Sequence, residues 1–216
     1  LVIKIKKMIN KIYKRIHSKY LNYIKFFFFL RYVITIFLIA TASFLLIPKF
    51  LNYEKRLDAI NEYLLNNYDL RLIRYSAIKY NIFPLPNLSI QNINSKIQNN
   101  NIDLKSNNII IFLDLKNIYY YNNFKARKIL LIGNDVSIDI VKIDNLFNNN
   151  NKLKSKLAIK ELNIFLRKDK NPLLEVKNIN FFNYGYLKHR IRGEVFGKKF
   201  KTSVSNENND ISFKIL

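Results

Sequence analysis

Cysteine is absent from this 216-residue chain, and histidine and glycine are scarce. Without cysteine there is no disulfide framework, no thiolate metal site and no thiol nucleophile. The two histidines lie far apart, His17 in a basic leader and His189 between Lys188 and Arg190. Four isolated glycines form no P-loop, dinucleotide fingerprint or nucleophile elbow: Gly133, Gly185, Gly193 and Gly197. The sequence therefore predicts a protein that is not an enzyme and that has no cofactor and no metal site.

Acidic residues are missing from the first part of the chain, where Glu54 is the first to appear. An apolar run from Tyr32 to Pro48 precedes it, and Phe26–Leu30 extend this run upstream with Arg31 as the one interruption. A helix rises about 1.5 Å per residue, so roughly 20 apolar residues cross the hydrocarbon of a bilayer. The pattern predicts one transmembrane helix over residues 26–48.

The charge distribution predicts the orientation of this helix. Nine basic residues precede the apolar run without any acid, whereas basic and acidic residues are mixed after it. Basic flanks stay on the cytoplasmic side, which places the N-terminus inside and the rest of the chain across the membrane. A cleaved signal peptide is the alternative, with Thr41-Ala42-Ser43 as its cleavage site. The apolar residues Phe44–Ile47 continue beyond that site, which favours an uncleaved anchor.

The leader, residues 1–25, has apolar residues at three- and four-residue spacing with lysines between them: Ile5, Ile9, Ile12, Ile16, Tyr20 and Tyr23. This is typical of a basic amphipathic helix that lies on an anionic inner leaflet. The alternative is the ordinary basic flank of a membrane span. The chain begins with Leu1, which indicates an unusual start codon or a fragment, with Met8 as another start.

The net charge of +22 is typical of proteins that bind nucleic acid or anionic membranes. Part of it has a simpler origin, because lysine, asparagine, isoleucine, tyrosine and phenylalanine are abundant together, as in an AT-biased coding sequence. The membrane anchor favours phosphate-rich lipid headgroups as the partner, with no nucleic acid. Nucleic-acid binding would require a cytoplasmic C-terminus.

The remaining chain is expected to be one domain that is mainly β. Residues 49–68 read as a juxtamembrane helix with Tyr53, Leu57, Ile60 and Leu64 on one face. From residue 69 to 216 apolar and polar residues alternate, which predicts about nine or ten half-buried strands. We expect an elongated antiparallel sheet, curled into a groove or closed as a sandwich, with short helical pieces at 113–121 and 143–149. The last strand pattern stops at Leu216, which indicates a truncated chain or an edge that further strands extend.

The apolar face of this sheet is the candidate functional site. There is too little helix to cover the strands, so an open trough would expose a strip of alkyl and aromatic side chains that suits acyl chains. The alternative is the ordinary core of a sandwich. The candidate lipid-groove residues are Leu88, Ile90, Ile110, Phe112, Val136, Ile138, Ile140, Leu162 and Ile164.

The order of these elements resembles the N-terminal, membrane-anchored region of the AsmA-like family. The resemblance rests on the basic start, the single span, the juxtamembrane helix and the segment Asn81-Ile82-Phe83-Pro84-Leu85-Pro86-Asn87-Leu88-Ser89-Ile90-Gln91-Asn92-Ile93. Further strands follow in the family's order over 108–113, 125–140, 157–166 and 173–181. The resemblance is clearest from about Phe26 to Ile140.

The resemblance implies a location and a function. It implies a single-pass protein of the inner membrane with a cytoplasmic N-terminus and a β-rich periplasmic domain. It also implies that the domain binds or conducts phospholipid and contributes to outer-membrane biogenesis and lipid homeostasis. No catalytic residues follow from it. Two alternatives stay open: a scaffold that recruits envelope proteins through exposed strand edges, and an LptC-like component of lipopolysaccharide transport.

Overall fold

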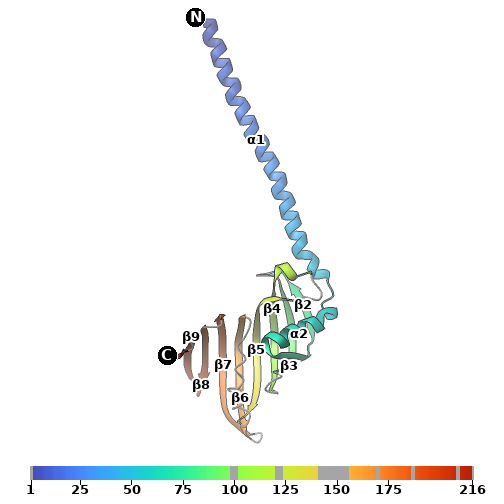
Figure 1. Ribbon diagram of the computed structural model, residues 1–216, viewed down its shortest axis with the longest axis vertical. Coiled ribbons are helices and arrows are strands. Elements are labelled where there is room, and N and C mark those ends of the chain that lie inside the picture. Colours follow the sequence, from blue (N-terminus) through green and yellow to red (C-terminus); the bar gives the residue numbers. More distant parts are fainter. Residues whose placement is uncertain are drawn as a thin grey trace. The chain divides into compact units, whose positions relative to one another are not determined.

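The computed structural model describes residues 2–97, 102–119, 124–140, 156–168, 171–185, 188–207 and 210–215 (Figure 1). The chain forms two compact units, Leu1–Ile47 and Pro48–Leu216. Ten strands in one sheet make up most of the second unit. The expected class, mainly β with an N-terminal helix, is confirmed.

The first unit is one continuous helix, α1, at Val2–Leu46. Its length of 45 residues corresponds to about 67 Å at the helical rise per residue. The helix is long and apolar enough to cross a membrane, and its large apolar side chains are exposed. Within the apolar part, the Thr35 hydroxyl donates to the Arg31 carbonyl at 2.8 Å, which satisfies that hydroxyl inside the helix. Since a bilayer's hydrocarbon is about 30 Å thick, α1 exceeds what one crossing needs.

The second unit begins with three short helical elements in place of the single helix expected at 49–68. They are the 3₁₀ helices η1 (Ile47–Phe50) and η2 (Glu54–Arg56) and the α-helix α2 (Leu57–Tyr68). The chain turns before η2 because the Asn52 side-chain oxygen accepts from the backbone N–H of Glu54 at 3.0 Å. Helix α2 ends at Asp69, whose left-handed backbone (φ 57°) directs its N–H to the last carbonyls of the helix.

The strands follow in an almost unbroken meander. Their bounds are β1 Leu70–Arg74, β2 Ala77–Asn81, β3 Asn87–Ile97, β4 Ile102–Leu113, β5 Ala126–Asp139, β6 Lys156–Lys168, β7 Asn171–Gly185, β8 Lys188–Val195, β9 Lys198–Glu207 and β10 Asp210–Ile215. A short 3₁₀ helix, η3 (Leu115–Asn117), follows β4. It covers part of the helical piece expected at 113–121, whereas 143–149 lies outside the described residues.

The sheet is single-layered, mixed and not closed, with the order β1-β3-β4-β5-β6-β7-β8-β9-β10. Strands β1 and β2 share one edge of β3, β1 beside its second half and β2 beside its first. The expectation of a purely antiparallel sheet is wrong at one place, because β5 and β6 run parallel. Parallel neighbours need a crossover, and residues 141–155 connect these two strands. The described residues contain no second sheet, so the sandwich alternative is not what the structure shows.

A row of left-handed residues crosses the middle of the sheet. Asn92, Gly133, Glu161 and Asn178 have φ between 47° and 62°, one in each of β3, β5, β6 and β7. The pairing register places the β3, β5 and β6 members on one line, with Asn107 of β4 between Asn92 and Gly133. We call the four residues the left-handed row.

This row changes which residues of each strand face the core. Core-facing positions are two residues apart within each half of a strand but three apart across the row, as between Ile90 and Ile93. In an ordinary strand a spacing of three would move a side chain to the opposite face. The left-handed residue compensates for that change, so both halves of β3, β5 and β6 contribute to one apolar cluster.

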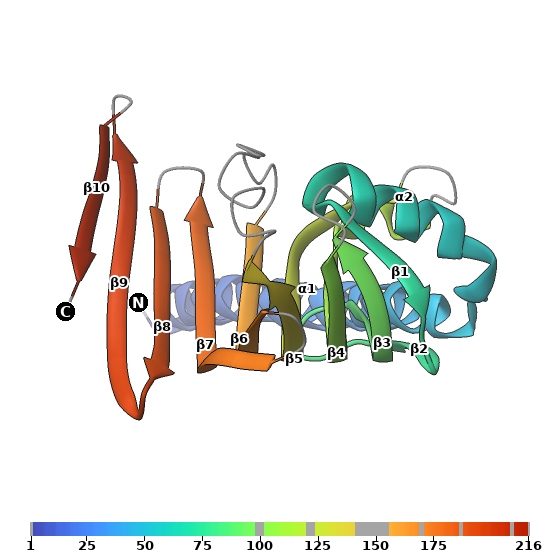
Figure 2. The ribbon, with the colours of Figure 1, turned by 90° about the horizontal axis from the view of Figure 1, so that it is seen from below.

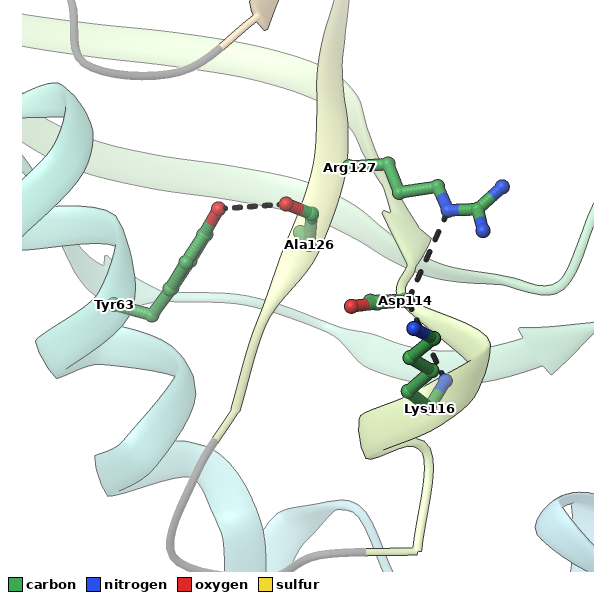
Figure 3. Close-up of polar contacts among 5 residues, drawn as sticks. All are labelled: Tyr63, Asp114, Lys116, Ala126 and Arg127. Carbon is green, nitrogen blue, oxygen red and sulfur yellow. Dashed lines mark hydrogen bonds and ion pairs between the residues drawn. The ribbon is translucent and has the colours of Figure 1, made fainter.

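Helix α2 covers this apolar face over β3, β4 and β5, and β6 to β10 extend beyond it (Figures 1 and 2). Ile60 and Leu64 of α2 are fully buried in the same cluster as the strand residues. Two tyrosine hydroxyls fix the helix to the strands: Tyr63 donates to the Ala126 carbonyl at 3.0 Å (Figure 3), and Tyr68 to the Lys156 carbonyl at 3.2 Å. The core therefore lies between α2 and one half of the sheet.

Candidate functional site

A small apolar cavity lies at the margin of α2, where the covered half of the sheet meets β6. Its volume is about 130 Å³. The lining comes from the end of α2, from β1 and from β3 to β6: Tyr68, Leu70, Ile97, Leu104, Ile129, Leu131, Asn134, Val136, Leu157, Ile159 and Leu162. Apolar cavities of about 150 Å³ stay dry and bind small hydrocarbons. The cavity therefore has room for the end of an acyl chain and not for a whole lipid.

Asn134 is the one amide in this apolar lining, and its hydrogen bonds are satisfied by the protein. The residue is fully buried. Its side-chain oxygen accepts from the Ser106 hydroxyl at 2.7 Å, and its amide nitrogen donates to the Lys160 carbonyl at 3.0 Å. Lys160 directly precedes Glu161 of the left-handed row. Asn134 thus stabilises the backbone of β6 beside the row, and it does not need a polar ligand.

The apolar face continues from the cavity along β6. Leu162, Ile164 and Leu166 pack against the core cluster but are only partly buried. Their register partners on β5 are Asn134, Val136 and Ile138, so all six side chains lie on the same face of the sheet. A partly exposed alkyl strip next to an apolar cavity is a surface on which a hydrocarbon chain can lie with its end in the cavity.

Six of the nine candidate groove residues lie on this face. Leu88 and Ile90 are completely buried under α2, so they belong to the core and are not accessible to a ligand. Val136 and Ile138 are 6% and 8% exposed, and Leu162 and Ile164 are partly buried. Val136 and Leu162 line the cavity.

Of the other three candidates, two lie on the opposite face and the third lies beyond the end of β5. Ile110 and Phe112 pair with Ser89 and Asn87, whereas Leu88 and Ile90 pair with Ile111 and Ile109. Residues directly paired across a ladder share a face, so Ile110 and Phe112 point to the opposite side of the sheet. Ile140 follows the end of β5 and is 41% exposed. Within β5 the core-facing positions change at Gly133, with Ile129 and Leu131 buried before it and Val136 and Ile138 buried after it.

Sequence reasoning missed most of the cavity lining. Tyr68, Leu70 and Ile97 come from three elements that meet only in the folded unit, and Leu157 and Ile159 lie in an expected strand but are not among the candidates. One sequence pattern could have indicated the change of face along the strands. In several strands two core positions are three residues apart, with a glycine or asparagine between them.

Two larger hollows on β7 to β9 have a different chemistry. One of about 440 Å³ is lined by apolar residues, Leu173, Leu174 and Phe196 among them, together with Glu175, Lys177 and Glu194. One of about 570 Å³ is lined by Arg192, Lys199 and Lys201, with Phe200 among others. Charged side chains therefore share both linings with apolar ones, whereas the cavity beside α2 has no charged residue in its lining. Within the described ranges, no group of three or more histidine, aspartate or glutamate side chains is placed to hold a metal ion.

His189 on β8 gives a pH-dependent prediction. Its ring stacks on Phe181 at 5.6 Å between centroids, and its Nδ1 has no hydrogen-bond partner among the described residues. Burial lowers the pKa of His189 from its usual 6.5. The unfolded chain then binds the proton more tightly, so the free energy of unfolding should fall as pH drops below about 6.5 and level off below the folded pKa.

Urea denaturation of the full chain between pH 5 and 8 measures this dependence. In His189→Phe, which keeps a ring on Phe181, the decrease between pH 6.5 and 5 should become smaller. His17→Phe is the matched control, because His17 lies in the other unit, and its curve should follow the wild type. An unchanged slope in His189→Phe would contradict the prediction.

The chain was compared with known proteins by a scan of protein-family models and a search of curated proteins. No family model matches it, and the search of curated proteins finds no match either.

Proposed function

We propose that this protein is a membrane-anchored lipid-binding protein, in which the apolar sheet face beside α2 receives the acyl chains of phospholipids. The single observation that supports this most is the apolar cavity at the margin of α2, which continues into the partly exposed strip on β6. Helix α1, which can cross a bilayer, would keep this surface close to a supply of phospholipid.

The chemistry of the surface favours a hydrocarbon chain over a polar ligand. Ten of the eleven residues that line the cavity are aliphatic or aromatic, and the eleventh, Asn134, already has protein partners for its amide. Burying apolar surface is favourable in proportion to its area, at roughly 25 cal/mol per Å². A ligand that covers Leu162, Ile164 and Leu166 would therefore gain affinity from these side chains alone.

The location and the physiological role follow from the charge pattern and the AsmA-like order of elements. We place α1 in the inner membrane, with the basic leader on the cytoplasmic side bound to anionic lipid and the sheet in the periplasm. In this setting the protein would bind or conduct phospholipid for outer-membrane biogenesis and lipid homeostasis. A fusion reporter after Leu216 tests the orientation, and a cytoplasmic C-terminus would contradict it.

Acyl-chain contact can be mapped by photocrosslinking in the full chain. The protein is reconstituted into vesicles that contain a phospholipid with a diazirine at the end of one acyl chain, and crosslinked peptides are identified by mass spectrometry. We expect crosslinks in α1, which serves as the internal positive control, and a second set within β5 and β6 around Leu131 and Leu162.

Leu162→Trp should remove the second set by filling the cavity, while the crosslinks in α1 remain. Leu157→Phe fills less of the same space and should reduce the signal partly. Ile73→Trp is the matched control, because Ile73 is 54% exposed and does not line the cavity. If the wild type is crosslinked in α1 and nowhere in β5 or β6, the proposed function is wrong.

The scaffold alternative predicts a different product. Exposed strand edges bind other chains by extending the sheet, and β10 pairs with β9 on one side. In cells, β10 would then be crosslinked to one protein in a fixed ratio to this chain, while β5 and β6 show no lipid crosslinks. This result would favour a scaffold that recruits envelope proteins.

A further inference from the structure

Three large apolar side chains of the second unit are exposed within five positions of the stacked pair Tyr53 and Tyr80. Phe50 of η1 and Phe83 are each 85% exposed, and Leu85 is 53% exposed. Phe83 and Leu85 flank Pro84 in the connection between β2 and β3. We call Phe50, Phe83 and Leu85 the apolar tip.

The backbone that carries this tip is fixed. The side-chain amide of Asn87 donates to the Leu85 carbonyl at 2.7 Å and to the Phe83 carbonyl at 3.4 Å. The Leu113 N–H donates to the Pro86 carbonyl at 2.9 Å, which joins the same connection to β4. Phe83 and Leu85 are therefore exposed on a connection whose backbone is held by hydrogen bonds to β3 and β4.

The tip lies at the end of the sheet where the chain enters the unit. The ring of Tyr53 stacks on Tyr80 near the end of β2, with centroids 6.0 Å apart and 9° between the planes. The Arg56 guanidinium donates to the Ile118 carbonyl just after η3. Tyr53 follows Pro48 by five positions, a reach of about 18 Å at most. The apolar segment of α1 ends directly before Pro48, so this end of the sheet is the end nearest the anchor along the chain.

Cations predominate at this end of the unit. Exposed basic side chains are present in η1, in β2, in η3 and at the start of β5: Lys49, Lys79, Lys116, Lys125 and Arg127. The acids next to η1 and η3 in the chain are Glu54 and Asp114. Asp114 is already engaged, since its carboxylate caps η3 and lies 3.9 Å from the Arg127 Nε (Figure 3). Apolar groups among cations are complementary to the headgroup region of an anionic bilayer.

We propose that the apolar tip inserts into the surface of the anionic bilayer that α1 spans. The tip would thereby hold the folded unit against the membrane at its anchor end. A protein partner is less suitable, because a stable interface buries about 800 Å² on each side, and three side chains of at most about 250 Å² each provide less. The proposal goes beyond acyl-chain uptake and does not depend on it.

The chain contains no tryptophan, so one introduced indole reports on its own surroundings. Phe83→Trp is reconstituted as the full chain into vesicles of zwitterionic and anionic phospholipid, with bromine on the acyl chains. We expect blue-shifted emission and roughly twofold or greater quenching by the brominated lipid, since interfacial side chains lie about 5–10 Å into the headgroup and acyl boundary. Because Phe83 is 85% exposed, the substitution should leave the thermal melt unchanged.

Phe196→Trp is the matched control. Phe196 is 84% exposed, in the turn between β8 and β9, and the register places this turn at the opposite strand ends from Phe83. Its emission should remain red-shifted and unquenched. The docking proposal is wrong if the indole of Phe83→Trp is unquenched, or if the indoles of the two variants are quenched equally.

The role of the cations is tested in the same preparation. Lys79→Glu combined with Lys125→Glu in the Phe83→Trp background should reduce the quenching of the indole in anionic vesicles and change it little in purely zwitterionic ones. Equal quenching in both vesicle types, with and without the lysine substitutions, would overturn the requirement for anionic lipid. Because acyl-chain crosslinks in β5 and β6 are measured separately, failure of tip insertion and failure of the proposed function can be told apart.

Discussion

Leu64→Ala is expected to lower the free energy of unfolding of the second unit by about 2–5 kcal/mol. Leu64 is completely buried in the last part of α2, in the cluster that joins this helix to the sheet. A helix of 12 residues is too short to be stable by itself, so α2 depends on this packing. Alanine would remove most of the buried side chain and leave a cavity between the helix and the strands.

Urea denaturation of the full chain in detergent, followed by tyrosine fluorescence, measures the effect. Ile73→Ala is the matched control, because Ile73 of β1 is 54% exposed, and it should change the free energy by less than about 0.5 kcal/mol. Leu64→Ala should also alter the crosslinks in β5 and β6, since Tyr68 of α2 is part of the cavity wall. If Leu64→Ala and Ile73→Ala have equal free energies of unfolding, the packing of Leu64 between α2 and the sheet does not stabilise the second unit.

The helices and most strands could be predicted from periodicity because each depends on a local pattern. The apolar run before Pro48 has the length of a membrane span, and the spacing of Ile60 and Leu64 places both on one helical face. Alternation identifies most of the strand segments between residues 87 and 215. These patterns depend on residues a few positions apart, and the structure preserves them.

The assignment of side chains to faces fails for a different reason. Alternation groups Ile110 with Phe112 within β4, but whether they share a face with Leu88 of β3 depends on the register between the two strands. The left-handed row then reverses the alternation midway along several strands, as at Gly133. The parallel pairing of β5 and β6 has no local signature in either strand. The cavity depends on all of these non-local features, and only part of it could therefore be predicted.

Gly133→Val is expected to destabilise the second unit by about 2–5 kcal/mol, the sum of about 1–2 kcal/mol for a left-handed side-chain residue and about 1–3 kcal/mol for overpacking. The backbone at Gly133 has φ 62°, and a Cβ there would lie 2.3 Å from the side-chain nitrogen of Asn107 and 2.9 Å from its Cγ. Asn107 is exposed and can turn partly away, but its own Cβ would still be 3.1 Å from the new atom. The strain falls in the middle of the row that keeps both halves of β5 on one apolar face.

Gly197→Val separates the two contributions. Gly197 has φ 73°, and a Cβ there would meet no atom within 4 Å, so only the backbone cost of about 1–2 kcal/mol should appear. The difference between the two variants in urea denaturation measures the contact with Asn107, and Asn107→Gly added to Gly133→Val should recover most of it. If Gly133→Val and Gly197→Val are equally stable, crowding at the row is not important. In that case the left-handed backbone alone determines why glycine occupies position 133.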